Sequence, residues 1–216
     1  MPRYFAVYKP YGVLSQFSAS EGKATLADCF RVPRDVYPVG RLDYDSEGLL
    51  LLTSDRALNH RLLAPRFGHE REYLVQVDGA VDAEAIRRLR GGLSIQVGGV
   101  AHATLACDAF LVAESPRVAP RHPPIRVRKA IPAPWLRLVL REGKNRQVRK
   151  MCAAVGFPVL RLIRTRIEGL ALDAMAPGDM VELPQRVVLG KLFGEPRGEQ
   201  RAGTAARRST TATQGD

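Results

Sequence analysis

Three acidic side chains stand at alternate positions in one short stretch of the chain. Asp43, Asp45 and Glu47 lie within VGRLDYDSEGLLLLTSD, where four leucines follow the second glycine directly. A carboxylate at the edge of a buried segment can attack an electron-poor sugar carbon or stabilise its charge. Burial raises a carboxyl pKa, whereas an arginine partner lowers it by ~1–3 units. Arg41 and a basic helix described below supply such partners.

The same spacing is also similar to the start of a calcium-binding loop, in which oxygen ligands alternate before a glycine. The twelfth position of such a loop, which should be glutamate, is Ser54, and the preceding segment contains Pro38. The stretch 69–73, HEREY, lacks the second histidine of a zinc-binding helix. We therefore predict no metal site.

Residues 142–158, EGKNRQVRKMCAAVGFP, predict a short helix with a basic face. Asn145 is the expected N-cap, and Gly156 is expected to end the helix. The spacing of a buried helical face is occupied by Val148, Met151, Cys152 and Val155. The basic residues of this segment are Lys144, Arg146, Arg149 and Lys150.

The whole chain is strongly basic, with 33 Lys and Arg against 22 Asp and Glu and a net charge of +11. Such a charge typically indicates a polyanionic partner, of which nucleic acid is the first candidate. The alternative is a soluble protein that is simply rich in arginine. The basic helix could likewise be only a solvated face, but five more arginines in the flanking strands, Arg137, Arg141, Arg161, Arg164 and Arg166, favour phosphate binding.

Residues 114–134 contain six prolines and five basic residues against one acid. This segment, which includes Arg126 and Arg128, is either a solvated connector or a basic arm that lies along phosphates.

Short strand-like and helix-like stretches alternate through the body of the chain. The apolar run 49–53 predicts a strand buried on both faces. Further strands are expected at residues 3–8, 73–77, 93–97, 103–112 and 135–140, and helices at 54–63, capped by Ser54 or Asp55, and at 82–90. From Gly194 onward no aliphatic side chain is larger than alanine, so we expect a disordered tail, 194–216, after a folded body, 1–193.

Cysteine usage and hydropathy favour a cytoplasmic protein. Cys29, Cys107 and Cys152 are far apart and odd in number, so reduced thiols are expected. The N-terminus lacks the apolar core of a signal peptide, and we expect no membrane span.

Four separated motifs closely resemble those of the RsuA-type pseudouridine synthases, and they occur in the family's order. They are KPYG at 9–12, GRLDYDSEGLLLLTSD, REY at 71–73, and EGKNRQVRKM followed by VLRLIR. The resemblance covers residues 3 to about 185. It implies an α+β fold in which helices flank a mixed, mostly antiparallel sheet, with a central RNA-binding cleft between two subdomains. Because KPYG begins at residue 9, we expect no N-terminal S4 module, and members that modify 23S rRNA are the most similar.

The resemblance also implies roles for particular residues. Asp43 matches the catalytic aspartate, Tyr73 the tyrosine that packs on the target base, and Arg149 the arginine that pairs with the aspartate. Arg41 matches a residue that can fill the gap left by the flipped nucleotide. Asp45 and Glu47 gain no catalytic role and are expected to form turns or to pair with arginines. The expected RNA-binding residues are Arg41, Lys9, Lys144, Asn145, Arg146, Lys150, Arg164, Arg126 and Arg128.

The implied reaction breaks the bond from uracil N1 to ribose C1′ and rejoins the base through C5. No atom is gained or lost, so no cofactor is expected, and ribosomal RNA is the expected partner of a monomeric enzyme. The sequence leaves open whether Asp43 attacks C1′ or removes a ribose proton, and which uridine is modified. One rival is a non-catalytic RNA-binding or ribosome-assembly protein on the same fold, and another is a glycosylase that releases free uracil.

Overall fold

The computed structural model describes residues 1–125, 128 and 130–194. Of the predicted tail, only Gly194 belongs to the described residues, and Arg126 also lies outside them. The strands are β1 (Tyr4–Lys9), β2 (Val13–Leu14), β3 (Ala24–Thr25), β4 (Tyr37–Pro38), β5 (Glu47–Thr53), β6 (Arg71–Val77), β7 (Ser94–Val97), β8 (Val100–Ala103), β9 (Asp108–Leu111), β10 (Trp135–Leu140), β11 (Val159–Ile167), β12 (Leu170–Ala171) and β13 (Met180–Glu182). The helices are α1 (Leu26–Cys29), α2 (Arg56–Leu63), α3 (Ala83–Gly91), α4 (Gln147–Ala154) and α5 (Gln185–Phe193), with a 3-10 turn at Pro65–Phe67.

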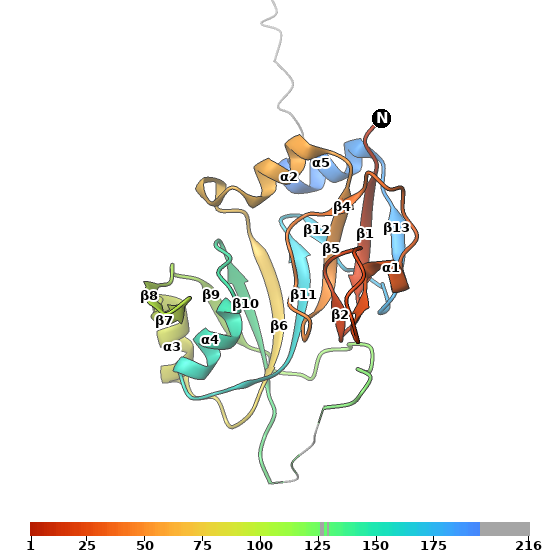
Figure 1. The fold of residues 1–216 in the computed structure, drawn as a ribbon. Helices are drawn as coiled ribbons and strands as arrows, with labels where there is room; N and C mark the ends of the chain where they lie inside the picture. The colour runs from red at the N-terminus through yellow and green to blue at the C-terminus, as the bar shows by residue number, and fades with distance from the viewer. Residues whose placement is uncertain (126–127, 129, 195–216) are drawn as a thin grey trace, which may run out of the picture.

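In the described part of the chain, one nine-stranded sheet runs through the molecule in the order β13-β1-β5-β11-β6-β10-β9, with β4 beside β5 and β12 beside β11 (Figure 1). Within this sheet the β5–β11 pair is parallel, and the other pairs formed by described residues are antiparallel. The predicted fold class, α+β with a mixed and mostly antiparallel sheet, is confirmed. The predicted division into two subdomains stays a prediction.

The predicted strand at residues 49–53 is confirmed as β5, which is buried on both faces. Because side chains alternate along a strand, Leu49 and Leu51 enter the core cluster that contains α2 and α5. Leu50 and Leu52 enter the opposite cluster, which contains α1. The helices α2 and α5 lie across one end of the sheet, at the top of Figure 1. A strand held from both sides in this way gives the loop before it a fixed end.

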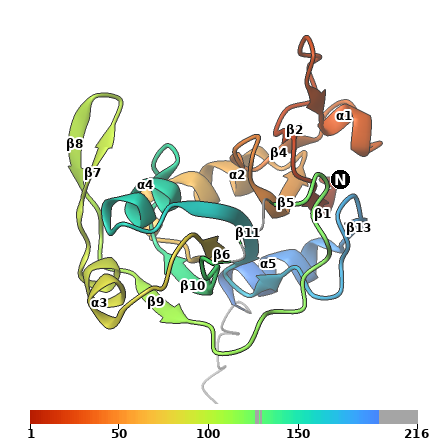
Figure 2. The same ribbon diagram turned by 90° about the horizontal axis from the view of Figure 1, so that it is seen from below.

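A third cluster packs α3 and α4 against β6 and β10. The four apolar residues predicted for the buried face of the second helix, Val148, Met151, Cys152 and Val155, all lie in this cluster. The hairpin β7–β8 projects beyond α3 and α4 (Figure 2). Asp55, one of the two residues expected to cap α2, does so by accepting a hydrogen bond from the Leu58 N–H. Asp82, for which no cap was predicted, accepts from the Ala85 N–H in the first turn of α3.

The strand expected at residues 103–112 is wrong, because it divides into the end of β8 and a separate β9. Between the two, the backbone N–H of Leu105 donates to the side chain of Glu142, and that of Cys107 donates to the carbonyl oxygen of Arg90. These two N–H groups are therefore not available for hydrogen bonds between strands of a sheet.

None of the helices in the described residues is both long and apolar enough to cross a membrane. Cys29, Cys107 and Cys152 are all free thiols.

Gly48, in β5, is expected to be the glycine that tolerates substitution least. Its φ of +107° disfavours any side chain, and an added Cβ would overlap the backbone carbonyl oxygen of Arg164 on β11. Strain and overpacking together predict that Gly48→Ala lowers the free energy of unfolding by about 2–6 kcal/mol. Gly91, at the end of α3, has nothing within 4 Å of an added Cβ, so Gly91→Ala serves as the control. Urea denaturation measures both, and similar stabilities would contradict the prediction.

Candidate active site

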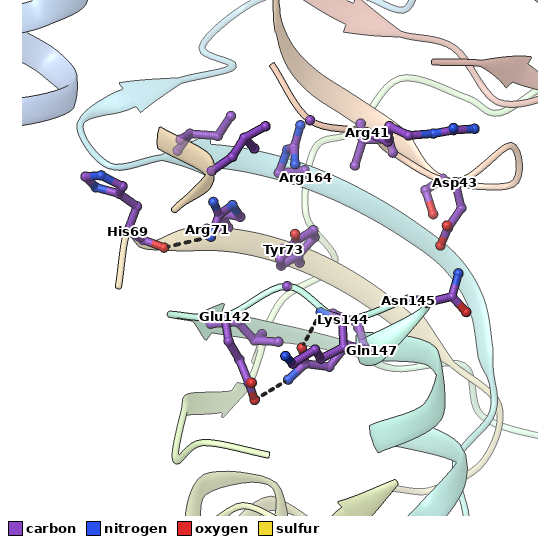
Figure 3. Close-up of a pocket in the computed structure, with 18 of the residues that line it drawn as sticks. Arg41, Asp43, His69, Arg71, Tyr73, Glu142, Lys144, Asn145, Gln147 and Arg164 are labelled. Atoms are coloured by element: carbon purple, nitrogen blue, oxygen red, sulfur yellow. Dashed lines mark hydrogen bonds between the residues drawn. The ribbon is translucent and has the colours of Figure 1, made fainter. Parts of the chain in front are cut away.

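A cleft of about 730 Å³ lies over β6 and β11, between the loop that precedes β5 and the loop that precedes α4 (Figure 3). Seven of the predicted site residues line it: Arg41, Asp43, Tyr73, Lys144, Asn145, Arg146 and Arg164. The cleft is basic, because six cationic residues line it, Arg41, Arg71, Arg141, Lys144, Arg146 and Arg164, against the acidic Asp43 and Glu142. This balance of charge suits a polyanionic ligand.

The loop that carries Asp43 is fastened along its length. Asp43 opens a tight turn in which its carbonyl oxygen accepts from the N–H of Ser46 at 3.0 Å, a position that favours aspartate. The hydroxyl of Ser15 bonds both backbone groups of Leu42, donating to the carbonyl oxygen and accepting from the N–H. The carbonyl oxygen of Tyr44 accepts from the N–H of Gly12, within KPYG. Asp43 is therefore held on a rigid turn, with 32% of its side chain exposed.

The arginine that approaches Asp43 is not the expected one. Arg149 forms no ion pair with Asp43 within the described structure; its Nη2 donates to the backbone carbonyl oxygen of Asp45 at 2.6 Å, and its Nε lies 3.3 Å from Oδ2 of Asp45. Nη1 of Arg146 lies 3.8 Å from Oδ2 of Asp43. The prediction that Arg149 pairs with Asp43 is thus wrong, because its guanidinium reaches Asp45, two residues further along the loop. Arg149 fixes the turn and does not line the cleft, so we treat it as a positioning residue.

Asp45 and Glu47 pair with arginines, as expected. Both oxygens of Asp45 accept from Arg146, at 2.9 and 2.8 Å. Burial alone would raise the pKa of Asp45, but the hydrogen bond from Arg146 and the charges of Arg149 and Arg146 outweigh it and lower that pKa. Glu47 forms a buried two-pronged pair with Arg161, at 2.8 and 2.7 Å. Two of the carboxylates that would be ligands at the start of a calcium-binding loop are therefore paired with arginines.

The loop before α4 is shaped by Gln147, and the predicted N-cap is wrong. The N-cap is Arg146, in the left-handed conformation, rather than Asn145. The buried Gln147 side chain accepts from the N–H of Lys144 and donates to Glu142. Burial would raise the pKa of Glu142, but hydrogen bonds from the Leu105 N–H and from two side chains lower it. Gln147 thus folds residues 142–146 back on themselves, and Asn145 is left to accept from Lys150 at 3.3 Å.

Lys9 is not available to bind RNA, which corrects a further prediction. Its side chain is 0% exposed, and its Nζ donates to the carbonyl oxygens of Pro10 and Val13. Burial lowers the pKa of Lys9 to about 8, although Glu47 and other nearby groups raise it. Lys9 is the last residue of β1, which lies between β13 and β5, so its amine stabilises the KPYG turn from inside. Arg128 pairs with Asp78 at 3.1 Å, away from the cleft lining.

Several residues of the cleft had no role in the sequence interpretation. Arg71 ties the start of β6 to α2, because its guanidinium donates to the carbonyl oxygens of His69 and Leu62. Glu142 and Gln147 belong to the EGKNRQ motif, and their side chains bond each other. The signal in the sequence was a pair of polar residues, one just before and one at the start of a helix with a buried face.

In the described ranges, no group of three or more His, Cys, Asp or Glu side chains could hold a metal ion.

Similarity to known proteins points to one family. The sequence profile described as RNA pseudouridylate synthase matches residues 3–154. A protein of Xanthomonas axonopodis pv. citri (strain 306), "Ribosomal large subunit pseudouridine synthase E", is 52% identical over 171 residues, which are 78% of this chain and 87% of that protein. A protein with the same name from Vibrio vulnificus (strain CMCP6) is 43% identical over 175 residues, 81% of this chain and 72% of that protein.

Solved structures agree on the fold. "Crystal structure of pseudouridylate synthase" superposes with a TM-score of 0.71 at 26% identity, covering 89% of this chain and 74% of that one. "Human RNA Pseudouridylate Synthase Domain Containing 1" superposes with a TM-score of 0.54 at 14% identity, covering 84% and 78%. The second similarity concerns the fold alone.

Proposed function

This chain belongs to the RNA pseudouridylate synthase family, and from that premise we propose that it isomerises a uridine of 23S ribosomal RNA to pseudouridine with Asp43 as the catalytic carboxylate. Pseudouridine synthases are isomerases, so the reaction class follows from the family. The names of the relatives from Xanthomonas and Vibrio support the large ribosomal subunit as the source of the substrate.

The observation that carries this proposal is the position of Asp43 on a rigid turn in the wall of a basic cleft. Tyr73, on β6, lines the same cleft, so one ligand can meet the carboxylate and the aromatic ring together (Figure 3). We infer that the target uridine leaves its helix and enters the cleft, at a cost of a few kcal/mol in lost stacking and pairing. Because Arg41, Lys144 and Arg146 line the cleft, they are proposed to hold the flanking phosphates.

The isomerisation of uridine to pseudouridine needs no added reactant. The N1–C1′ bond breaks, and its electron pair leaves with the base as a uracil anion. Asp43 assists this step by attacking C1′ or by taking a ribose proton; either route frees the base. The uracil then turns and C5 bonds to C1′. In the first route this displaces the Asp43 carboxylate from C1′, and in the second the ribose regains its proton from Asp43. The C5 proton is then lost, and N1 takes up a proton. Tyr73 is proposed to pack against the ring and keep it in place during the turn.

Its monomeric state and cytoplasmic location are also part of the proposal. The three free thiols support a reducing compartment.

Mapping pseudouridines in ribosomal RNA, with and without this protein, tests the proposal. We expect a strain that lacks the gene to lose one or a few pseudouridines of 23S rRNA, and the purified protein to restore them on RNA from that strain. Free uracil in the reaction would indicate a glycosylase instead. RNA binding without any new pseudouridine would indicate a non-catalytic protein, and either result would overturn the proposal.

A further inference from the structure

Arg164 is a buried cation in the wall of the cleft, and one of its nitrogens lacks a partner (Figure 3). The residue is only 4% exposed. Its Nε donates to the backbone carbonyl oxygen of Leu49 at 2.8 Å, whereas its buried Nη2 finds no hydrogen-bond acceptor among the described residues. By contrast, the Nε and Nη2 atoms of Arg161, another buried arginine of the same strand, donate to Glu47 and to the carbonyl oxygen of Ala119.

A guanidinium in this state is costly for the fold. Burial lowers the pKa of Arg164, the phenol of Tyr73 raises it, and the nearby Arg71 lowers it further. Arginine does not lose its proton in proteins, so the charge remains, and a donor that is buried without an acceptor loses its hydration without compensation. An oxygen atom supplied by a ligand in the cleft would satisfy Nη2.

The strand register places Arg164 between the two residues expected to act on the substrate. On one side it pairs with Gly48, at the end of the loop that holds Asp43. On the other side it pairs with Tyr73 on β6. A nucleotide whose sugar reaches Asp43 and whose base contacts Tyr73 would therefore bring the base, rather than an exposed phosphate, to Arg164.

The reaction generates negative charge on that base. Once the N1–C1′ bond has broken, the bonding pair spreads over N1, C5 and the two carbonyl oxygens of the uracil anion. A fixed donor in a site that excludes water stabilises developing charge more than it stabilises the neutral ground state. This holds whether Asp43 attacks C1′ or removes a ribose proton, because both routes release the same anion.

We propose that Arg164 donates a hydrogen bond from Nη2 to a carbonyl oxygen of the flipped uracil and stabilises the anion formed when the N1–C1′ bond breaks. This inference rests on the proposed function and adds a catalytic residue to it. A phosphate of the RNA is the competing source of an oxygen, and the experiment must separate the two.

The first test is Arg164→Met, because apolar replacement of a buried charge is often tolerated by the fold. The single-turnover rate at saturating RNA should fall by about 100-fold or more. The affinity for RNA should stay within about 3-fold of the wild type, and the slope of log K against log salt should not change. Lys144→Gln is the contrasting variant, because the exposed lysine should contact phosphate: affinity should fall, and the slope of log K against log salt should decrease by about 0.7. Arg164→Lys should recover part of the rate.

The second test substitutes sulfur for one carbonyl oxygen of the target, using RNA that carries 2-thiouridine or 4-thiouridine. Sulfur is the poorer acceptor, so the wild type should slow on the RNA whose contacted oxygen is replaced, while Arg164→Met should not distinguish that RNA from the normal one. Such coupling in a double-mutant cycle indicates direct contact. Independent, additive effects would overturn the inference, as would a loss of affinity and salt slope with an intact rate. A wild type that forms no pseudouridine would overturn the proposed function itself.

Discussion

Asp43→Asn is expected to reduce pseudouridine formation by about 10³–10⁴-fold, while RNA affinity changes by less than about 3-fold. Asparagine keeps the size of the side chain and is as acceptable as aspartate at the first position of the turn. The turn bond from the Ser46 N–H is made to the backbone, so it does not depend on the carboxylate. The substitution therefore removes the negative charge that either attacks C1′ or takes a ribose proton, without disturbing the turn that holds the side chain. Single-turnover conversion and filter binding on the same RNA measure the two quantities.

Asp45→Asn is the matched control, because it makes the same change two residues away on the same loop. Asp45 is engaged by Arg146 and Arg149, and the shortest contact from Arg149 is to its backbone carbonyl oxygen, which the substitution keeps. We expect a loss of activity of no more than about 10-fold from the weakened turn. If Asp43→Asn converts uridine at close to the wild-type rate, or if the control is impaired equally, the assignment of Asp43 is wrong.

The parts of this molecule that could be predicted from sequence are those specified by neighbouring residues. The run of leucines specified β5 because a strand needs only its own apolar side chains to be recognised. The spacing of Val148, Met151 and Cys152 specified the buried face of α4 in the same way. Asp55 and Asp82 bond N–H groups three residues on, so a helix cap is also visible in a short window.

The errors concern contacts between segments far apart in the chain. Arg149 meets Asp45 across 104 positions, and no local pattern states which of two nearby carboxylates it will reach. Lys9 was expected to bind RNA, and lysine is rarely buried, but its strand β1 lies between β13 and β5, and the two carbonyl oxygens of its own turn satisfy the buried amine. Asn145 lost the role of N-cap because the Gln147 N–H, which such a cap would bond, donates instead to the carbonyl oxygen of Lys144.

The changed partner of Arg149 alters what its removal should do. The guanidinium is 14% exposed, and it spans from α4 to the turn that follows Asp43, so it fixes the distance between the two walls of the cleft. Arg149→Ala leaves a backbone carbonyl oxygen and a carboxylate with fewer donors, and the turn should shift. Because misplacement of a reacting group by about 1 Å can cost about 10²-fold, we expect kcat to fall by about that factor. Lys150, the next residue, makes only a 3.3 Å contact with Asn145, so Lys150→Ala should mainly weaken RNA binding.

The activity of Arg149→Lys distinguishes a positioning role of Arg149 from a role in supplying charge to Asp43. If Arg149 acted by its charge on Asp43, Arg149→Lys would restore most of the activity. Lysine carries one nitrogen, so it cannot reproduce both contacts that the guanidinium makes with Asp45, and we expect Arg149→Lys to recover less than half of the loss in log kcat. Thermal unfolding of each variant separates a shifted turn from a lost fold. Comparable losses of kcat in Arg149→Ala and Lys150→Ala would mean that α4 serves phosphate binding alone, and that Asp43 is held in place by its own loop.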